Sequence, residues 1–266
     1  MQPCRLESRA VISLTGPEAR EFLQNLITND LGTLVPGRGL YAALLSSQGK
    51  IGFDFFVVEG EGGLLLDVGA DARDALLKKL KLYRLRTQVE IAARDELGVY
   101  AALTGDAVRR AVSFMDPRHA ALPARSIGAV AEMPAGLPGD DAYHAHRMAL
   151  GVPEGADFGF EKIFALDGGL DELNAISFTK GCYVGQELTA RMKHRATSRK
   201  RPVRVMAEGP LPPPGTAVSQ DSDVGEIIAA HGREGFASVR LDKWDTEKQA
   251  RAGDVAVTLT RPEWLA

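Results

Sequence analysis

The chain has 266 residues, of which 45% are hydrophobic and 25% are charged. This composition is typical of a globular protein with one large domain or two smaller ones. The net charge of −3 excludes a nucleic-acid-binding polycation, so any basic patch is local. The two cysteines, Cys4 and Cys182, are far apart, which predicts free thiols in a reducing compartment rather than a disulfide framework.

The N-terminal segment MQPCRLESRA lacks the apolar stretch of a signal peptide. The longest apolar runs, such as FDFFVV at residues 53–58, are far too short to span a bilayer. We therefore expect a cytoplasmic protein with no membrane partner.

The segment up to residue 103 predicts a few helices among many strands. Pro17 and the acids that follow it mark the start of one helix, and a short glycine turn at residues 48–50 indicates a hairpin. The predicted order is strand 9–16, helix 17–28, strands 39–47, 52–59 and 64–68, helix 71–84, and strands 89–93 and 98–103. Few helices with mostly antiparallel strands favour an α+β fold over a doubly wound sheet.

The remainder of the chain changes character twice. Residues 104–139 contain scattered prolines and predict irregular structure, and residues 142–151 predict a short helix closed by glycine. After Pro202, short β-compatible runs alternate with turn residues, which is typical of a small β-barrel or sandwich.

The surroundings of Cys182 hold the most unusual chemistry. A helix is predicted from Tyr183 to His194, with Gly181 and Cys182 at its start. A helix N-terminus favours the thiolate and lowers the pKa of a thiol, and Lys180 adds to this effect, whereas Glu187 opposes it. The alternative is a buried structural cysteine in a glycine-rich turn. No spacing typical of a metal site is present, so we expect no permanently bound metal. The functional interpretation that is left for Cys182 is a transient, shared or catalytic thiol.

A run of positive charge follows the thiol. Its interpretation is either a solvated surface at a domain junction or an anion site for a polyglutamate tail, a phosphate or RNA. The acidic balance of the whole chain makes nucleic acid the weaker choice. The run contains Arg191, Lys193, His194, Arg195, Arg199, Lys200, Arg201 and Arg204.

The stretch KGCYVGQE at residues 180–187 resembles the signature of YgfZ-type folate-binding proteins, which act in iron–sulfur cluster assembly and are relatives of the glycine cleavage T-protein, an aminomethyltransferase. Further segments are similar to this family, namely residues 14–31, 41–58, 115–118 and 146–153. The resemblance implies ferredoxin-like elements around a central pocket, with a C-terminal antiparallel β-barrel. It places the folate-binding region at residues 1–200, with two subdomains that meet near 104–140, and the barrel at 201–266.

The resemblance also implies a ligand, tetrahydrofolate or a one-carbon derivative, and a set of site residues. Cys182 would be the reactive or cluster-contacting thiol, and Lys180 would favour its thiolate. The residues implied to shape the motif are Gly181, Tyr183, Gly185, Gln186 and Glu187, and those implied to line the folate pocket are Asp54, Asn29, Asp30 and Arg147. From the residues alone, Asp54 is equally a solvent-facing strand residue, Asn29 and Asp30 are turn residues, and Arg147 is an ion-pair partner.

The chain departs from the T-protein pattern in three places. Phe53–Asp54 stands where T-proteins have two aspartates, Met148 and Ala149 stand directly after Arg147 where T-proteins have a glutamate shortly after the arginine, and the T-protein motif lacks the cysteine. These differences favour a folate-binding accessory protein that uses Cys182 to assemble or repair clusters on client enzymes, including tRNA-modifying enzymes. Its partners would be iron–sulfur client or assembly proteins. The alternative functions are a folate-dependent aminomethyl or one-carbon transferase and, with less support, an RNA binder that uses residues 191–204.

Overall fold

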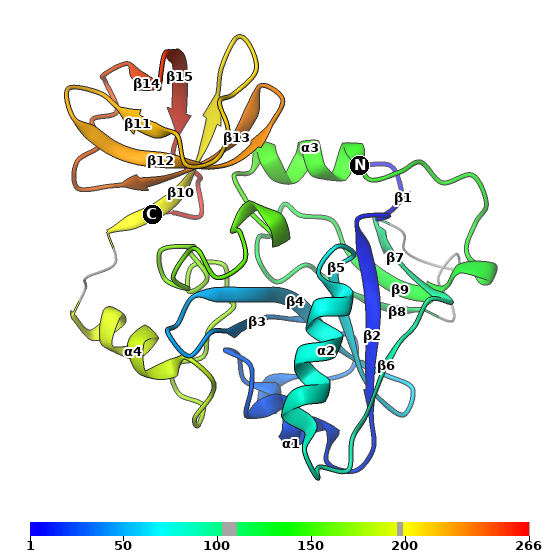
Figure 1. Ribbon diagram of the computed structural model, residues 1–266. Helices are drawn as coiled ribbons and strands as arrows, with labels where there is room; N and C mark the ends of the chain where they lie inside the picture. Colours follow the sequence, from blue (N-terminus) through cyan, green and yellow to red (C-terminus); the bar gives the residue numbers. More distant parts are fainter. Residues whose placement is uncertain (103–110, 196–198, 266) are drawn as a thin grey trace. The chain divides into compact units, whose positions relative to one another are not determined.

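The computed structural model describes residues 1–102, 111–195 and 199–265 (Figure 1). The chain forms two compact units. The first contains residues 1–44, 53–146 and 174–184, and the second contains residues 45–52, 147–173 and 185–266. Each unit therefore combines stretches that are distant in the sequence.

A five-stranded sheet forms the larger part of the first unit, with the order β3–β4–β5–β2–β6. Its strands are β2 (Arg9–Thr15), β3 (Leu40–Leu45), β4 (Ile51–Gly60), β5 (Gly63–Gly69) and β6 (Glu90–Ala93). The pairs β2–β5, β2–β6 and β4–β5 are antiparallel. The tip of the β3–β4 hairpin, residues 45–52, is counted with the second unit.

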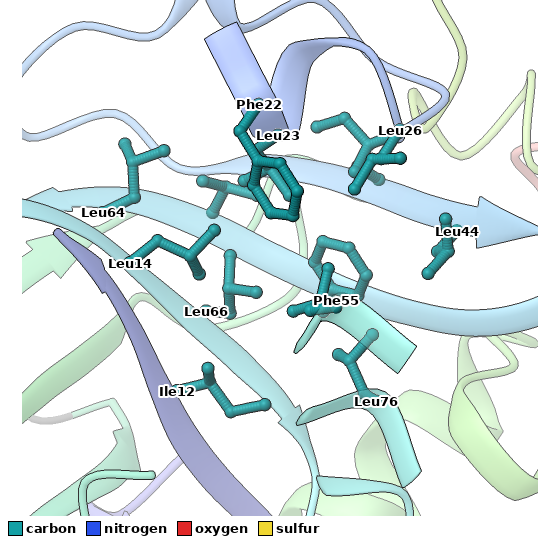
Figure 2. Packing of buried hydrophobic residues seen from close by; sticks show 14 of the residues in the cluster. Ile12, Leu14, Phe22, Leu23, Leu26, Leu44, Phe55, Leu64, Leu66 and Leu76 are labelled. Atoms are coloured by element: carbon teal, nitrogen blue, oxygen red, sulfur yellow. The ribbon is translucent and has the colours of Figure 1, made fainter. Parts of the chain in front are cut away.

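The hydrophobic core of the first unit lies between this sheet and its two helices. Figure 2 shows alternate side chains of β2 and β5, such as Ile12 and Leu66, packed with Phe22 and Leu76. Phe22 belongs to α1 (Ala19–Gln24), and Leu76 belongs to α2 (Arg73–Arg84). The period of two in the strands and the 3.6-residue period in the helices therefore bring apolar side chains to a common layer.

The helix predicted over residues 17–28 is shorter in the structure, since α1 ends at Gln24. Thr28 explains the early end of the helix. Its backbone N–H donates to Ala43 O at 3.0 Å and its hydroxyl donates to Ala175 O at 2.6 Å, so the chain leaves the helix for two partners that are distant in sequence.

A second sheet in the first unit has the order β1–β7–β9–β8. Its strands are β1 (Cys4–Arg5), β7 (Leu97–Ala101), β8 (Val112–Phe114) and β9 (Arg125–Ala129). The prediction of irregular structure over 104–139 is wrong for β8 and β9, whereas residues 103–110 lie outside the described ranges. Arg125 and Ser126 are both fully buried, so β9 lacks the apolar pattern by which a buried strand is predicted.

The second unit contains a closed barrel with the order β10–β13–β12–β11–β14–β15. The strands are β10 (Lys200–Met206), β11 (Ala217–Ser219), β12 (Asp223–His231), β13 (Glu234–Arg240), β14 (Ala250–Ala252) and β15 (Val255–Thr260). Valines such as Val203 and Val239 fill its interior. Before the barrel, this unit contains α4 (Gln186–Arg195) and the last residues, 147–149, of α3 (Asp141–Ala149). The α+β class and the C-terminal antiparallel barrel are thus confirmed.

Candidate functional site

Cys182 lies in a loop rather than at the start of a helix. The predicted helix start at Tyr183 is wrong, because α4 begins at Gln186. Gly185 is the reason: its φ of 82° lies in the left-handed region, outside helical geometry. A Cβ at this position would lie 2.5 Å from Ser46 O, so close approach to the hairpin tip requires glycine here. Three residues therefore separate Cys182 from the first residue of the helix.

The thiol of Cys182 is exposed and free, whereas that of Cys4 is buried. The interpretation of Cys182 as a buried structural cysteine is therefore wrong. The residues on either side of it differ sharply in exposure: Gly181 is exposed, but Lys180 and Tyr183 are only 7% and 8% exposed. The loop therefore presents a single thiol to solvent between two buried anchors.

Lys180 is the stronger of these anchors. Its ammonium donates to Gln24 O at 2.6 Å, Ile27 O at 2.7 Å and Asn29 O at 2.8 Å, and it also lies 5.4 Å from the ring centroid of Tyr183. Burial lowers the pKa of Lys180 to about 8, so the protonated form with three N–H donors predominates at neutral pH. The structure thus uses these donors to fix the loop onto the turn that follows α1.

Replacing Lys180 with methionine is expected to loosen this loop. The change leaves three carbonyl oxygens without their donor, and we expect a loss of about 1–3 kcal/mol in the free energy of unfolding. Urea unfolding measures this loss, and limited proteolysis detects earlier cleavage at residues 177–184. Lys193→Met is the matched control, because Lys193 is half-exposed and forms an ion pair with the carboxylate of Asp171. Equal stability and equal cleavage in both variants would contradict the anchoring role.

The rest of the motif continues into α4. Gln186 and Glu187 form the first turn of the helix, and Glu187 accepts a hydrogen bond from Arg191 at 2.6 Å. The Glu187 side chain is 87% exposed, so this ion pair adds little stability. These residues set the direction in which the chain leaves the thiol loop.

Three residues predicted for a folate pocket lie in the first unit. Asp54 is 4% exposed, which excludes the solvent-facing interpretation, and it accepts a hydrogen bond from the Tyr41 hydroxyl at 2.8 Å. Asn29 donates to Tyr41 O and to Asn174 O, both at 2.8 Å. Tyr41 therefore brings Asp54 and Asn29 together, one at its hydroxyl and the other at its carbonyl.

Asp30 caps the short 3-10 helix at Leu31–Thr33 by accepting from Gly32 N at 2.8 Å. This bond and a second one from Gln24 lower the pKa of Asp30. The geometry is that of a turn residue. Oδ1 of Asp30 and the side-chain N–H groups of Asn29 are engaged within the protein, and a folate contact of these two residues stays a prediction.

Arg147, the fourth pocket residue, belongs to the second unit. It is 4% exposed and forms an ion pair with Asp157 at 2.6 Å and a longer one with Glu154 at 3.5 Å. Asp157 in turn accepts from His231 Nε2 at 2.7 Å. This network matches the ion-pair interpretation of Arg147. Sequence reasoning missed Asp157 and His231, although the spacing of Glu154 and Asp157 is that of a capping box.

A buried cluster of arginines in the first unit was also missed. Asp67 binds Arg9 and Arg125, each at 2.6 Å, and Asp116 binds Arg118 at 2.7 Å. The Tyr143 hydroxyl accepts from Arg118 at 2.8 Å and from Arg125 at 2.7 Å. All three guanidinium groups also lie within 6 Å of the ring centroid of Phe56. Such a network fixes the side chains of β2, β5 and β9 in one arrangement.

The basic run after the thiol is largely neutralised. Six of its seven lysines and arginines form ion pairs within the second unit: Arg191–Glu187, Lys193–Asp171, Arg199–Asp242, Lys200–Glu226, Arg201–Glu172 and Arg204–Glu234. This pairing favours the solvated-surface interpretation over a site for phosphate or RNA.

Two of these partners, Asp171 and Glu172, form an unusual carboxyl pair. Burial, together with Asp171, raises the pKa of Glu172 to about 7. Burial also raises the pKa of Asp171, but hydrogen bonds with Glu172 and Lys193 lower it on balance. Asp171 Oδ1 and Glu172 Oε2 are buried with no hydrogen-bond partner among the described residues. A proton held by Glu172 supplies the donor that this pair lacks.

The carboxyl pair predicts a loss of stability as pH rises. Because the pKa of Glu172 in the folded state is above its ordinary value of 4.5, its contribution is complete below that pH and is lost as pH rises through about 7. Glu172→Gln keeps a donor at every pH, so its Tm should fall less than that of the parent between about pH 6 and about pH 8.5. Glu226→Gln, at an exposed pair, is the control. Parallel Tm curves for Glu172→Gln and the parent would exclude a shared proton.

Neither a metal centre nor a membrane span is found among the described residues. In them, no group of three or more His, Cys, Asp or Glu side chains is placed to hold a metal ion. No helix in those ranges is long and apolar enough to cross a membrane.

Three comparisons with known proteins agree with this architecture. Residues 199–266 match a family model described as CAF17, C-terminal beta-barrel domain. Over 98% of its length, the chain is 33% identical to "Iron-sulfur cluster assembly factor IBA57, mitochondrial" of Mus musculus and of Homo sapiens, and it covers 84% of each. The homologue from Coccidioides immitis is 31% identical, with 98% of this chain and 82% of the homologue covered.

A solved structure shows the same fold. Aminomethyltransferase T of the glycine cleavage system from Bartonella henselae has a TM-score of 0.75, with 14% identity, over 98% of this chain and 85% of that one. At this identity the similarity concerns the fold alone. Two expectations are corrected by the comparisons: the relatives are IBA57 factors rather than the related YgfZ-type proteins, and they are named as mitochondrial, so the expected cytoplasmic location is wrong.

Proposed function

Because this chain belongs to the family of IBA57 iron–sulfur cluster assembly factors, we propose that it supports cluster assembly or repair on client enzymes and that Cys182 contacts the cluster. The observation that carries the role of the thiol is its exposure on a loop with two buried anchors, Lys180 and Tyr183. A thiol in this setting is accessible to another protein and held in a defined place.

The number of thiolates that a cluster needs indicates what the partner must supply. Thiolates are the usual protein ligands of iron–sulfur clusters, and a cluster takes about four of them. Cys182 supplies one ligand, and Cys4 is buried. The other ligands therefore come from an assembly or client protein, and the cluster is cargo that this chain helps to deliver or restore. Clients in this proposal include cluster-dependent tRNA-modifying enzymes.

The experiment that tests this function depletes the protein from the cells that produce it. Activities of cluster-dependent enzymes, measured per amount of enzyme protein, should fall, whereas enzymes that contain no cluster should keep full activity. Restoration by the intact chain completes the test. Full activity of all cluster enzymes in the depleted cells would refute the assembly role.

Folate binding stays a separate prediction, and no step of the proposed function passes through a folate. The carboxylate of Asp54 is a suitable acceptor for a pterin N–H, but it is 4% exposed and engaged with Tyr41. Titration calorimetry of the protein with tetrahydrofolate tests this prediction directly. The alternative function, an aminomethyl transferase, requires formation of methylene-tetrahydrofolate from tetrahydrofolate and an aminomethyl donor, which a turnover assay measures.

A further inference from the structure

A second surface in the first unit carries positive charge that the protein itself does not neutralise. It lies at the C-terminal end of α2 (cyan in Figure 1) and in the residues that follow. Residues 75–89 contain five cations and no acid. We call this the α2 surface and define it by Lys78, Lys79, Lys81, Leu82, Arg84, Leu85 and Arg86.

The cations of the α2 surface differ from those of the run at residues 191–204. Six of the latter are paired with carboxylates, whereas none of the five on the α2 surface has an aspartate or glutamate partner in the described part of the chain. Lys79 lies 5.6 Å from the ring centroid of Tyr83, and the other four cations are exposed. The charge of this surface is therefore available to a partner that brings carboxylates.

Two leucines make the α2 surface more than a solvated face. The apolar stripe of α2 is buried through Leu76 and Leu80, so it already has its partner in the core. Leu82 and Leu85 lie off that stripe and are 70% and 84% exposed. Water around two such side chains is unfavourable, and Arg84 and Arg86 beside them are of a residue type that is enriched at protein interfaces.

The backbone at Leu85 is also strained. Its φ of 48° and ψ of −109° fall where a residue with a side chain is rarely found. Such a conformation costs on the order of 1–3 kcal/mol and persists mainly where function or packing requires it. The hydrogen bond from Thr87 N to Arg84 O at 2.8 Å closes the turn in which Leu85 adopts this conformation, and the turn holds the leucine side chain 84% exposed.

The small apolar content of the α2 surface favours a peptide over a bilayer, because two leucines are few for the apolar face of an interfacial helix. A shallow, open depression of about 690 Å³ lies beside Leu85 and is lined by Glu18, Leu85, Arg86 and Thr87. An apolar side chain of a peptide would lie against it, with neighbouring carboxylates of the same peptide at Arg86 and Lys81.

We propose that the α2 surface binds an acidic segment of a partner protein, with an apolar side chain of that segment placed against Leu82 and Leu85. The cations attract the segment and set its direction, and the two leucines supply the contact that excludes water. The proposal for the α2 surface does not depend on the role of Cys182, and it stands even if the proposed cluster contact of Cys182 is disproved.

The test uses the full chain and a fluorescent peptide of about ten residues in which glutamate alternates with leucine, at about 0.15 M salt. Anisotropy should show saturable binding. Lys81→Glu combined with Arg84→Glu should weaken it about tenfold or more, and Leu85→Gly should weaken it to a similar degree. Because glycine accepts a positive φ, Leu85→Gly should keep or raise the Tm, so weaker binding cannot come from unfolding.

The matched control is Lys193→Glu combined with Lys200→Glu, which changes the net charge equally within the paired run and should leave peptide binding unchanged. Three outcomes would overturn the proposal. One is equal loss of binding in the control, which shows attraction to net charge alone. Another is unchanged binding in Leu85→Gly. The third is binding to vesicles of phosphatidylglycerol and phosphatidylcholine without binding to the peptide, which assigns the surface to lipid.

Discussion

Replacing Cys182 with alanine is expected to abolish the support of cluster enzymes and to leave the fold unchanged. The thiol is exposed and forms no disulfide, so its removal should change the free energy of unfolding by no more than about 0.5 kcal/mol. The same change removes the group proposed to contact the cluster. In cells that contain only this variant, cluster-dependent enzymes should be as inactive as in cells without the chain, at equal protein level.

Cys4→Ala is the control for this prediction, because it removes the other thiol. Cys4 is 1% exposed and burial raises the pKa of its thiol, so it is an inert core residue. Its replacement should cost about 1 kcal/mol of stability and leave cluster enzymes active. If Cys182→Ala cells keep full cluster-enzyme activity, the thiol has no role in assembly, and the depletion experiment still decides whether the chain itself has one.

The elements of the fold were predictable where their signal is local. Turn residues and the alternation of apolar and polar residues over a few positions predict the hairpin of β3 and β4 and the valine-rich strands of the barrel. β9 was missed because its polar residues are buried, and Arg125 is tolerated there because it contacts Asp67 and Tyr143, which are distant in sequence. Partners that meet only after folding leave no local pattern.

The same limit explains the site. The motif at residues 180–187 directed attention to Cys182, which is the exposed thiol, but the setting of this thiol depends on Gly185 beside Ser46 and on Lys180 beside Gln24 and Ile27. The sequence also drew attention to the basic run at residues 191–204, because spacing shows cations but not the carboxylates that pair with them. The residues 75–89, where no acid is present at all, carry the charge that remains available.

Asp67→Asn should destabilise the first unit more than any other single change considered above. Asp67 is fully buried and is the carboxylate partner of both Arg9 and Arg125 at 2.6 Å. Asparagine has the same shape but no charge, so two buried guanidinium groups lose the charge of their shared carboxylate, and Asp116 lies 3.7 Å from Arg125. Removing one partner from a buried ion pair costs about 3–5 kcal/mol, a large part of the roughly 5–15 kcal/mol that holds a domain folded.

Urea unfolding at neutral pH measures this loss, with Asp95→Asn as the control. Asp95 pairs with Arg73 but its side chain is 79% exposed, so water solvates both partners and the expected loss is below about 1 kcal/mol. A loss of similar size in the two variants would mean that the buried arginines find other compensation. A large loss in Asp67→Asn alone would show that the cluster around Phe56 depends on its carboxylates, since the cation–π contacts of the three arginines are retained in that variant.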